Sequence, residues 1–200
     1  MRVISGSYGG RNLFLPDTKA VRPTGGRAKE ALFSILGADV MGASVLDLFS
    51  GSGALGIEAL SRGAKRVVFA DIEPRYIKKN LALIGEEYDK TVYCGGGAKR
   101  SVVIGGAYEG TLSLLARAGE AFDIIFLDPP YNGELGESAI AGLINGGLVA
   151  DGGKIIFEHS RDKELKKLPD CAIIYDERRY GIQALSFIAV KKQRDFEVTL

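Results

Sequence analysis

The chain has 200 residues, of which 46% are hydrophobic and 26% are charged, and its formal net charge is +1. This composition is typical of a single globular domain with its own hydrophobic core. We expect no membrane span and no secretory signal, because no apolar run has the required length. Cys94 and Cys171 lie far apart without further ligands nearby. This spacing argues against a disulfide framework or a zinc site and favours the cytoplasm.

Basic residues gather towards both ends of the chain. Residues 1–30 contain six basic and two acidic side chains, and residues 161–194 contain nine basic and five acidic ones. Such a distribution indicates a local basic face, although ordinary solvated surface explains it equally well.

Taken in chain order, residues 1–20 alternate apolar and polar positions around a Gly-Gly pair and predict a β-hairpin. A helix is expected next over residues 27–36, ended by Gly37. Its predicted buried face consists of Ala28, Ala31, Leu32 and Ile35.

From residue 45 onwards, predicted strands alternate with predicted helices. Strands are expected at 45–49, 66–70, within 91–104, and at 122–128, 154–158, 171–176 and 184–190. Helices are expected at 53–63, 74–85, 110–118 and 136–145. This alternation predicts an α/β fold with a mostly parallel sheet. The last two strands have little chain between them and are expected to pair antiparallel. Ligands of such sheets bind at the carboxyl ends of the strands.

A glycine-rich turn follows the first buried strand. The stretch DLFSGSGALG, residues 47–56, has glycines at 51, 53 and 56 in a GxGxxG spacing. Glycines at these positions permit positive φ and let a ligand approach the backbone closely. The same spacing also occurs in purely structural turns.

Two acidic residues accompany this turn. Asp47 would repel a pyrophosphate but suits a cationic ligand or bound water. Asp71 ends the second strand, where a carboxylate can accept hydrogen bonds from both ribose hydroxyls. Glu73 is a rival for that role, and a helix cap before Pro74 is the structural alternative. The turn and the acid together indicate a nucleoside cofactor, either nicotinamide or S-adenosylmethionine.

The fourth strand of the alternating region ends in Asp128-Pro129-Pro130-Tyr131. The prolines fix the backbone and lack N–H groups, so the Pro129 carbonyl is held outward beside the Asp128 carboxylate. These two acceptors can bind the hydrogens of an exocyclic amine, while Tyr131 can stack on a base. Acceptors on such an amine free its delocalised lone pair and stabilise the charge that develops on nitrogen.

The glycine turn and this tetrad together predict an S-adenosylmethionine-dependent methyltransferase that acts on an exocyclic amine of a nucleobase. A rigid turn with a buried tyrosine is the structural alternative. A dehydrogenase, which could also use the glycine turn, has no use for the tetrad.

Several segments resemble the bacterial small-subunit rRNA guanine-N2 methyltransferases, which modify one guanine of 16S rRNA. They are RVISGSYGGRNL, VRPTGGRAKEALFSIL, DLFSGSGALGIEALSRGA, FDIIFLDPPY and the late Tyr180-Gly181 pair, and together they span nearly the whole chain. The resemblance implies a Rossmann-like, seven-stranded class I S-adenosylmethionine-dependent methyltransferase fold. It also implies an N-terminal β-hairpin extension at 1–20 and a methyltransferase domain at 21–200.

The resemblance also implies a cofactor site. Asp47, Gly51 and Gly53 would line the methionine end of S-adenosylmethionine, and Asp71 would hold its ribose. The further expected cofactor contacts are Phe49, Ile72, Gly106 and Ala107. One departure concerns the adenine amine, for which the family usually has an acidic or amide side chain after the third strand. In this chain the position falls on Gly97 or Gly106, which have no side chain.

On the substrate side, Asp128 and Pro129 would hold the guanine N2 amine, with Tyr131 against the ring and Pro130 stiffening the turn. The expected RNA contacts are Arg11, Arg22, Thr24 and Arg27, which would bind phosphates or the cofactor carboxylate. The single histidine, His159, is expected to be structural, because the amine proton can leave to water.

The partner implied by the resemblance is 16S rRNA within the assembled small ribosomal subunit, bound by a monomer without metal. Two alternatives remain open. One is an adenine-N6 methyltransferase, because the tetrad is shared with that class. The other is an inactive rRNA-binding assembly factor, which the missing adenine-binding side chain would favour.

Overall fold

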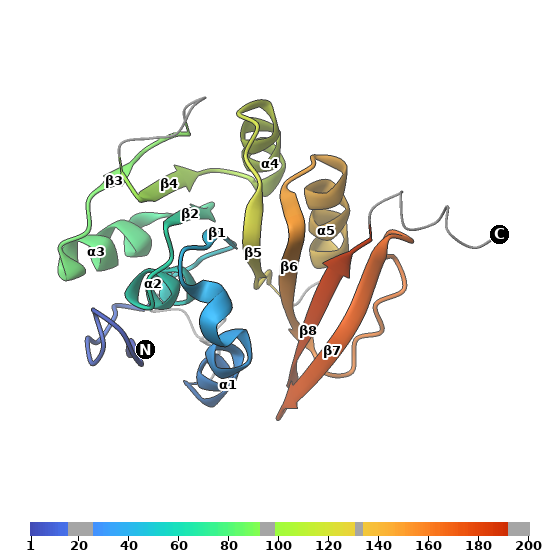
Figure 1. Ribbon diagram of the computed structural model, residues 1–200, viewed down its shortest axis with the longest axis horizontal. Coiled ribbons are helices and arrows are strands. Elements are labelled where there is room, and N and C mark those ends of the chain that lie inside the picture. The colour runs from blue at the N-terminus through green and yellow to red at the C-terminus, as the bar shows by residue number, and fades with distance from the viewer. Residues whose placement is uncertain (16–25, 93–98, 131–133, 192–200) are drawn as a thin grey trace.

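The computed structural model of the chain describes residues 1–15, 26–92, 99–130 and 134–191. Its strands are β1 (Ser44–Leu48), β2 (Arg66–Asp71), β3 (Tyr88–Asp89), β4 (Ser101–Gly105), β5 (Phe122–Leu127), β6 (Val149–Ser160), β7 (Ala172–Tyr180) and β8 (Gln183–Val190). They form one sheet in the order β3-β4-β2-β1-β5-β6-β8-β7 (Figure 1). The first six strands in this order pair in parallel with their neighbours. β8 pairs antiparallel with both β6 and β7. The predicted α/β class and the antiparallel pair at the end are confirmed.

The sheet has one strand more than the seven predicted. The additional strand is β3, which has two residues and pairs with β4 through Tyr88 and Asp89. Both residues are half-buried, so they produce no apolar run that a sequence pattern could reveal.

Five α-helices cover the two faces of the sheet within the described residues. They are α1 (Gly26–Leu36), α2 (Ala54–Ser61), α3 (Arg75–Ile84), α4 (Tyr108–Arg117) and α5 (Leu135–Asn145), and the 3₁₀ helix η1 (Gly37–Val40) follows α1. α1, α2 and α3 pack in one core cluster, and α4 and α5 in a second cluster on the opposite face (Figure 1). None of the helices in these ranges has the length and apolar character that crossing a membrane requires.

The buried face of α1 differs from the prediction. Leu32 and Ala28 are buried as expected, but Ile35 is 41% exposed and Lys29 is completely buried. Lys29 Nζ donates to the Arg2 carbonyl at 2.8 Å and forms an ion pair with Glu58 of α2 at 3.0 Å. Because a buried ammonium needs such partners, its burial depends on the fold and could not be predicted from helical periodicity.

The N-terminal segment, residues 1–15, is anchored to α2. Arg2 and Asn12 form an antiparallel bridge, flanked by backbone hydrogen bonds from Val3 N–H to the Arg11 carbonyl at 2.9 Å and from Leu13 N–H to the Met1 carbonyl at 2.7 Å. The backbone N–H groups of Ile4 and Ser5 donate to the Glu58 carboxylate instead of crossing to a second strand. The short antiparallel pairing thus ends at Val3, and Glu58 of α2 accepts the next two backbone N–H groups.

Candidate active site

The carboxyl ends of β1, β2, β5 and β6 lie at the same edge of the sheet. In the register of these parallel pairs, Leu48 is opposite both Ala70 and Leu127, and Leu127 is opposite Phe157. The glycine turn after β1 therefore lies between the turn after β2 and the turn after β5. The sequence predicts that the glycine turn and the Asp128 motif lie at one edge of the sheet, and the strand order brings the ends of β1 and β5 together there.

The glycine turn has a backbone that few residues can adopt. Gly51 and Gly53 have φ of 55° and 76°, and Phe49 has φ of 63°, the one positive value for a non-glycine residue in the described ranges. The Ser50 hydroxyl bonds the backbone of Asp47 and Ala70, and Ser50 N–H donates to the Ala70 carbonyl at 3.0 Å. These bonds join the turn to the end of β2 and hold Phe49 in its strained conformation.

Gly56 allows α2 to pack closely on the sheet. A Cβ atom at this position would lie 2.3 Å from Cε1 of Phe69 in β2, which is an impossible contact. At Gly51, by contrast, a Cβ atom would meet nothing within 4 Å. The third glycine of the motif therefore serves packing, while the first leaves open space beside the turn.

Asp47 lies beneath the turn with only 2% of its surface exposed. Its Oδ2 accepts a hydrogen bond from Gly56 N–H at 2.8 Å. Burial, with a smaller contribution from the nearby Asp71, raises the pKa of Asp47 to about 7, against the effect of that hydrogen bond. The carboxyl group is thus poised to respond to a cation placed at the turn.

Asp71 connects the turn to β2. Its Oδ2 accepts from Gly51 N–H at 2.7 Å, and its Oδ1 accepts from Glu73 N–H at 2.8 Å. A carboxylate has about four acceptor positions, so these bonds orient the group and leave capacity for ribose hydroxyls. Glu73, its rival in the sequence, has an exposed side chain.

Apolar side chains follow three of the strands at this edge of the sheet. Ile72 directly follows Asp71 and is 80% exposed, an unusual state for an isoleucine beside a candidate site. The rings of Phe49 and Tyr108 lie 5.5 Å apart between centroids, and Tyr108 begins α4. Sequence reasoning missed Tyr108. An aromatic residue in the first turn after the strand that neighbours β2 was the available signal.

The backbone conformation of Gly106 explains why a glycine occupies this position. The residue has φ of 132°, and its N–H donates to the Asp71 carbonyl at 3.1 Å. A side chain there would be strained, although the space around its Cβ position is open. Ala107 follows as the N-cap of α4. Gly97, the other candidate position, lies outside the described residues.

The turn after β5 begins with the motif that the sequence predicts to hold the substrate. Asp128 is half-buried, Pro129 is buried and Pro130 is exposed, whereas Tyr131 lies outside the described residues. Next to this turn, Glu158 of β6 is only 3% exposed, and Gln183 Nε2 of β8 donates to its Oε1 at 2.6 Å. Sequence reasoning missed Glu158, although it ends a predicted strand just as Asp71 and Asp128 do.

Two of the four predicted RNA contacts, Arg27 and Arg11, lie within the described residues. Arg27 is exposed in the first turn of α1, while Arg22 and Thr24 lie outside the described residues. Arg11 Nη1 donates to the carbonyl of Leu83 at 3.3 Å. Leu83 is eight residues after Arg75, the start of α3, which corresponds to roughly 12 Å along the helix away from the strand ends.

Asn80 of α3 is a buried link that sequence reasoning did not assign. Its side-chain amide exchanges two hydrogen bonds with the backbone of Phe14, at 2.8 and 2.9 Å. Its Nδ2 also donates to the Ser52 carbonyl at 2.8 Å. The N-terminal segment is thereby joined to the glycine turn.

His159 has the structural environment expected for it. It is 3% exposed, and its ring nitrogens lie 2.8 Å from the Ser160 carbonyl and from the Ser186 hydroxyl. Burial lowers its pKa, so the ring is neutral near pH 7.

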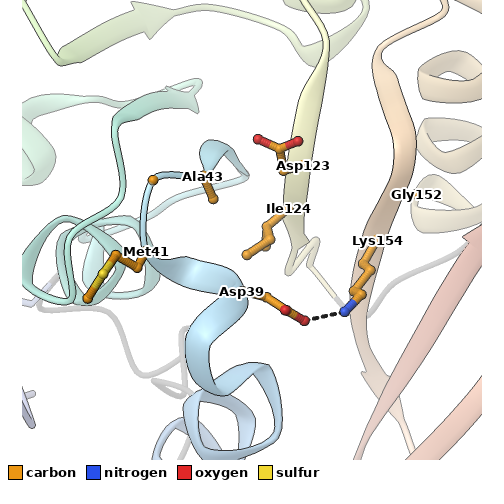
Figure 2. A pocket seen from close by; sticks show the side chains of 8 residues that line it. Asp39, Met41, Ala43, Asp123, Ile124, Gly152 and Lys154 are labelled. Atoms are coloured by element: carbon orange, nitrogen blue, oxygen red, sulfur yellow. Dashed lines mark hydrogen bonds and ion pairs between the residues drawn. The ribbon is translucent and has the colours of Figure 1, made fainter.

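A separate hollow of about 300 Å³ lies at the opposite edge of the sheet. Figure 2 shows it between Ala43, which precedes β1, Ile124 near the start of β5, and Lys154 of β6. The ammonium group of Lys154 bonds the Asp39 carboxylate. Because the hollow lies at the amino ends of the strands, it is distinct from the candidate active site. Across the described ranges, no three His, Cys, Asp or Glu side chains are grouped so that they could hold a metal ion.

Comparison with known proteins agrees with this architecture. The family model described as conserved hypothetical protein 95 matches residues 1–189. Ribosomal RNA small subunit methyltransferase D of Escherichia coli is 36% identical over 90% of this chain and 85% of its own length. The protein of the same name from Haemophilus influenzae is 35% identical over 91% of this chain and 90% of its own length.

Solved structures extend this likeness to the fold. The structure of yhhF from Escherichia coli, a candidate methyltransferase, superimposes with a TM-score of 0.78 and 30% identity, covering 96% of this chain and 99% of that chain. The more distant SMU.776, a candidate methyltransferase complexed with SAH, shares the fold at 16% identity, with a TM-score of 0.60 over 81% of this chain and 48% of that chain. The chain therefore belongs to the family described as conserved hypothetical protein 95 and is a relative of ribosomal RNA small subunit methyltransferase D.

Proposed function

We propose that this protein transfers a methyl group from S-adenosylmethionine to the exocyclic N2 of one guanine in 16S rRNA of the small ribosomal subunit. The observation that carries the proposal is the juxtaposition of two turns. The glycine turn follows β1, the Asp128-Pro129-Pro130 turn follows β5, and these two strands are parallel neighbours. The relatives named as small-subunit rRNA methyltransferases support rRNA as the substrate.

The residues at the ends of β1 and β2 fit S-adenosylmethionine. Asp71 would accept from the ribose hydroxyls, and the exposed Ile72 would cover a face of the adenine. Asp47, whose pKa of about 7 reflects an unfavourable burial, would gain from the positive methionine end of the cofactor. The open space beside Gly51 and Gly106 leaves room for such a ligand. When bound, the cofactor supplies an electrophilic methyl group.

The residues at the end of β5 would activate the nucleophile. The Asp128 carboxylate and the Pro129 carbonyl would accept the two hydrogens of the guanine N2 amine. This would localise the nitrogen lone pair and orient it towards the methyl group, since transfer requires the reacting atoms to be held about 3–3.5 Å apart and in line. The amine proton would then leave to water, without help from the neutral His159.

The RNA would approach over this edge of the sheet. Arg27 is exposed at the start of α1 and would bind a phosphate, as would Arg22 and Thr24. Arg11 would bind RNA only if the substrate also extends along α3. The target guanine would be extruded from its RNA helix, because Asp128 and the Pro129 carbonyl need access to the N2 amine. We place the catalytic domain at residues 21–200 and treat residues 1–20 as an extension.

The test is to methylate small ribosomal subunits from a strain that lacks this enzyme and to identify the product nucleoside by mass spectrometry. We expect N2-methylguanosine at one 16S rRNA position and incorporation of one methyl group per subunit. N6-methyladenosine would identify the adenine alternative. The absence of any transfer, despite S-adenosylmethionine binding in a calorimetric titration, would identify an inactive assembly factor. Free 16S rRNA assayed in parallel shows whether the assembled particle is required.

A further inference from the structure

A buried carboxylate that the proposed reaction does not use lies next to the Asp128 turn. The parallel pairing of β5 with β6 ends at Leu127 opposite Phe157. Asp128 and Glu158 are therefore the next residues on two adjacent strands, which lie about 4.8 Å apart in a sheet. A base bound by Asp128 at this edge would therefore lie close to Glu158 of β6.

Strand alternation puts the two positions on one face of the sheet. Phe126 and Ile156 belong to the core cluster beneath α1, α2 and α3, while Leu127 and Phe157 belong to the cluster on the opposite face. Because side chains two residues apart share a face, Asp128 continues the row of Phe126, and Glu158 continues the row of Ile156.

The surroundings of Glu158 favour a fixed, strongly discriminating acceptor. The residue is 3% exposed, and Gln183 Nε2 orients its Oε1 from β8 at 2.6 Å. A carboxylate accepts up to about four hydrogen bonds and donates none, so the bond from Gln183 is compatible with a further donor. Because this carboxylate is desolvated, a hydrogen-bond donor on the ligand would bind strongly beside it, whereas an acceptor on the ligand would be repelled.

Guanine and adenine differ in this respect along the Watson–Crick edge. Guanine presents N1–H beside its N2 amine, so two neighbouring positions are donors. Adenine presents N1 as an acceptor beside its N6 amine. We propose that Glu158 accepts a hydrogen bond from N1–H of the target base while Asp128 and the Pro129 carbonyl hold N2, so that Glu158 selects guanine over adenine. This inference rests on the proposed function and makes Glu158 a specificity-determining residue.

The test compares two bases at the target position. Small subunits are reconstituted with 16S rRNA that carries either guanine or 2-aminopurine there. 2-Aminopurine keeps the amine at C2 but has an N1 acceptor in place of N1–H. We expect the native protein to prefer guanine in kcat/KM by at least about tenfold, the value of one hydrogen bond to a charged group. Glu158→Gln replaces a carboxylate oxygen by an amide that can donate to N1 of 2-aminopurine, so this preference should fall about tenfold to a hundredfold. An intrinsic difference in reactivity between the two amines affects both proteins equally, so it cancels when the preference of the variant is compared with that of the native protein.

Glu137→Gln provides the matched control. Glu137 of α5 is also a buried glutamate, 5% exposed, and its Oε1 accepts from Lys167 N–H at 2.7 Å. The same substitution there should leave the ratio of guanine to 2-aminopurine unchanged. An unchanged ratio in Glu158→Gln, with methylation of guanine N2 still observed, overturns the inference and leaves the proposed function intact. N6-methyladenosine as the product of the native protein overturns both.

A second measurement needs no variant and holds even if Glu158→Gln fails to fold. The native protein is assayed on subunits carrying 6-thioguanine, which keeps N1–H and the C2 amine but weakens the acceptor at C6. It should methylate 6-thioguanine nearly as fast as guanine and 2-aminopurine much more slowly. Equal rates on 2-aminopurine and guanine would show that N1–H is not recognised and would overturn the inference.

Discussion

The two halves of the candidate site are built in different ways. On the cofactor side, Asp47, Gly51 and Asp71 come from two short stretches of adjacent strands, and backbone N–H groups bond both carboxylates. On the proposed base side, Asp128 follows β5 and Glu158 lies in β6, and the side chain of Gln183 is one of the groups that bond Glu158.

In the proposed reaction, one half of the site would serve cofactor binding and the other half methyl transfer. A half held by main-chain hydrogen bonds is ordered before any ligand arrives and contributes mainly to affinity. A half whose acceptors face the reacting amine acts where charge develops and contributes mainly to the rate. Substitutions in the two halves should therefore change different kinetic constants.

The largest effect is expected from Asp128→Ala on the base side. Removing one of the two acceptors on the N2 amine should lower kcat by at least about a thousandfold, at the upper end of what a single electrostatic contact contributes. The affinity for S-adenosylhomocysteine, measured by calorimetry, should remain nearly unchanged. Asp128→Asn keeps the size and one acceptor and should retain more activity than Asp128→Ala. Normal turnover by Asp128→Ala would remove the difference between the two halves.

A smaller effect of the opposite kind is expected from Asp71→Ala on the cofactor side. Loss of a charged acceptor for the ribose should raise KM for S-adenosylmethionine about tenfold to a hundredfold, with a smaller change in kcat. Glu73→Ala is the matched control, because this exposed acid lies two residues further on. If Glu73→Ala raises KM and Asp71→Ala does not, the roles of the two acids are reversed.

The smallest effect concerns the pH dependence of stability. The pKa of Asp47 is raised to about 7 in the folded protein, so the folded state holds a proton that the unfolded state releases near pH 4. The free energy of unfolding of the ligand-free protein should therefore lose about 2 kcal/mol from this group between pH 5 and pH 7. Asp47→Asn keeps an acceptor for Gly56 N–H and cannot titrate, so it should lack this loss. Urea denaturation at several pH values measures it, and identical slopes in both proteins would contradict the assigned burial cost.

Most of the fold could be predicted because its elements carry local signals. Seven strands and the helices between them follow from apolar runs and glycine stops, and the structure confirms that each exists. β6 and β7 are longer than predicted, at Val149–Ser160 and Ala172–Tyr180. The exceptions involve partners distant in sequence. β3 is visible only through its pairing with β4, and Lys29 is buried because Glu58 and the Arg2 carbonyl receive its ammonium group.

The same division applies to the site. The glycine turn, Asp71 and the Asp128 tetrad stand out in the sequence, because each follows directly on a buried strand. Glu158 also ends a predicted strand and Tyr108 follows one, but neither lies in a recognisable motif, and Asn80 lies within a helix. The positions of these three residues depend on contacts with residues distant in the chain. Asn80 bonds the backbone of Phe14 and Ser52. Tyr108 packs against the ring of Phe49, and Glu158 accepts a hydrogen bond from Gln183.

The sequence by itself thus determined the class of fold, the glycine turn and the acceptor turn, since strand–helix alternation and turn chemistry act within about ten residues. Only the tertiary structure decided which carboxylates are buried, how each is oriented, and that Glu158 stands beside Asp128. Those properties arise from the register of strands far apart in the chain, and register is set when the whole sheet assembles around its two hydrophobic layers.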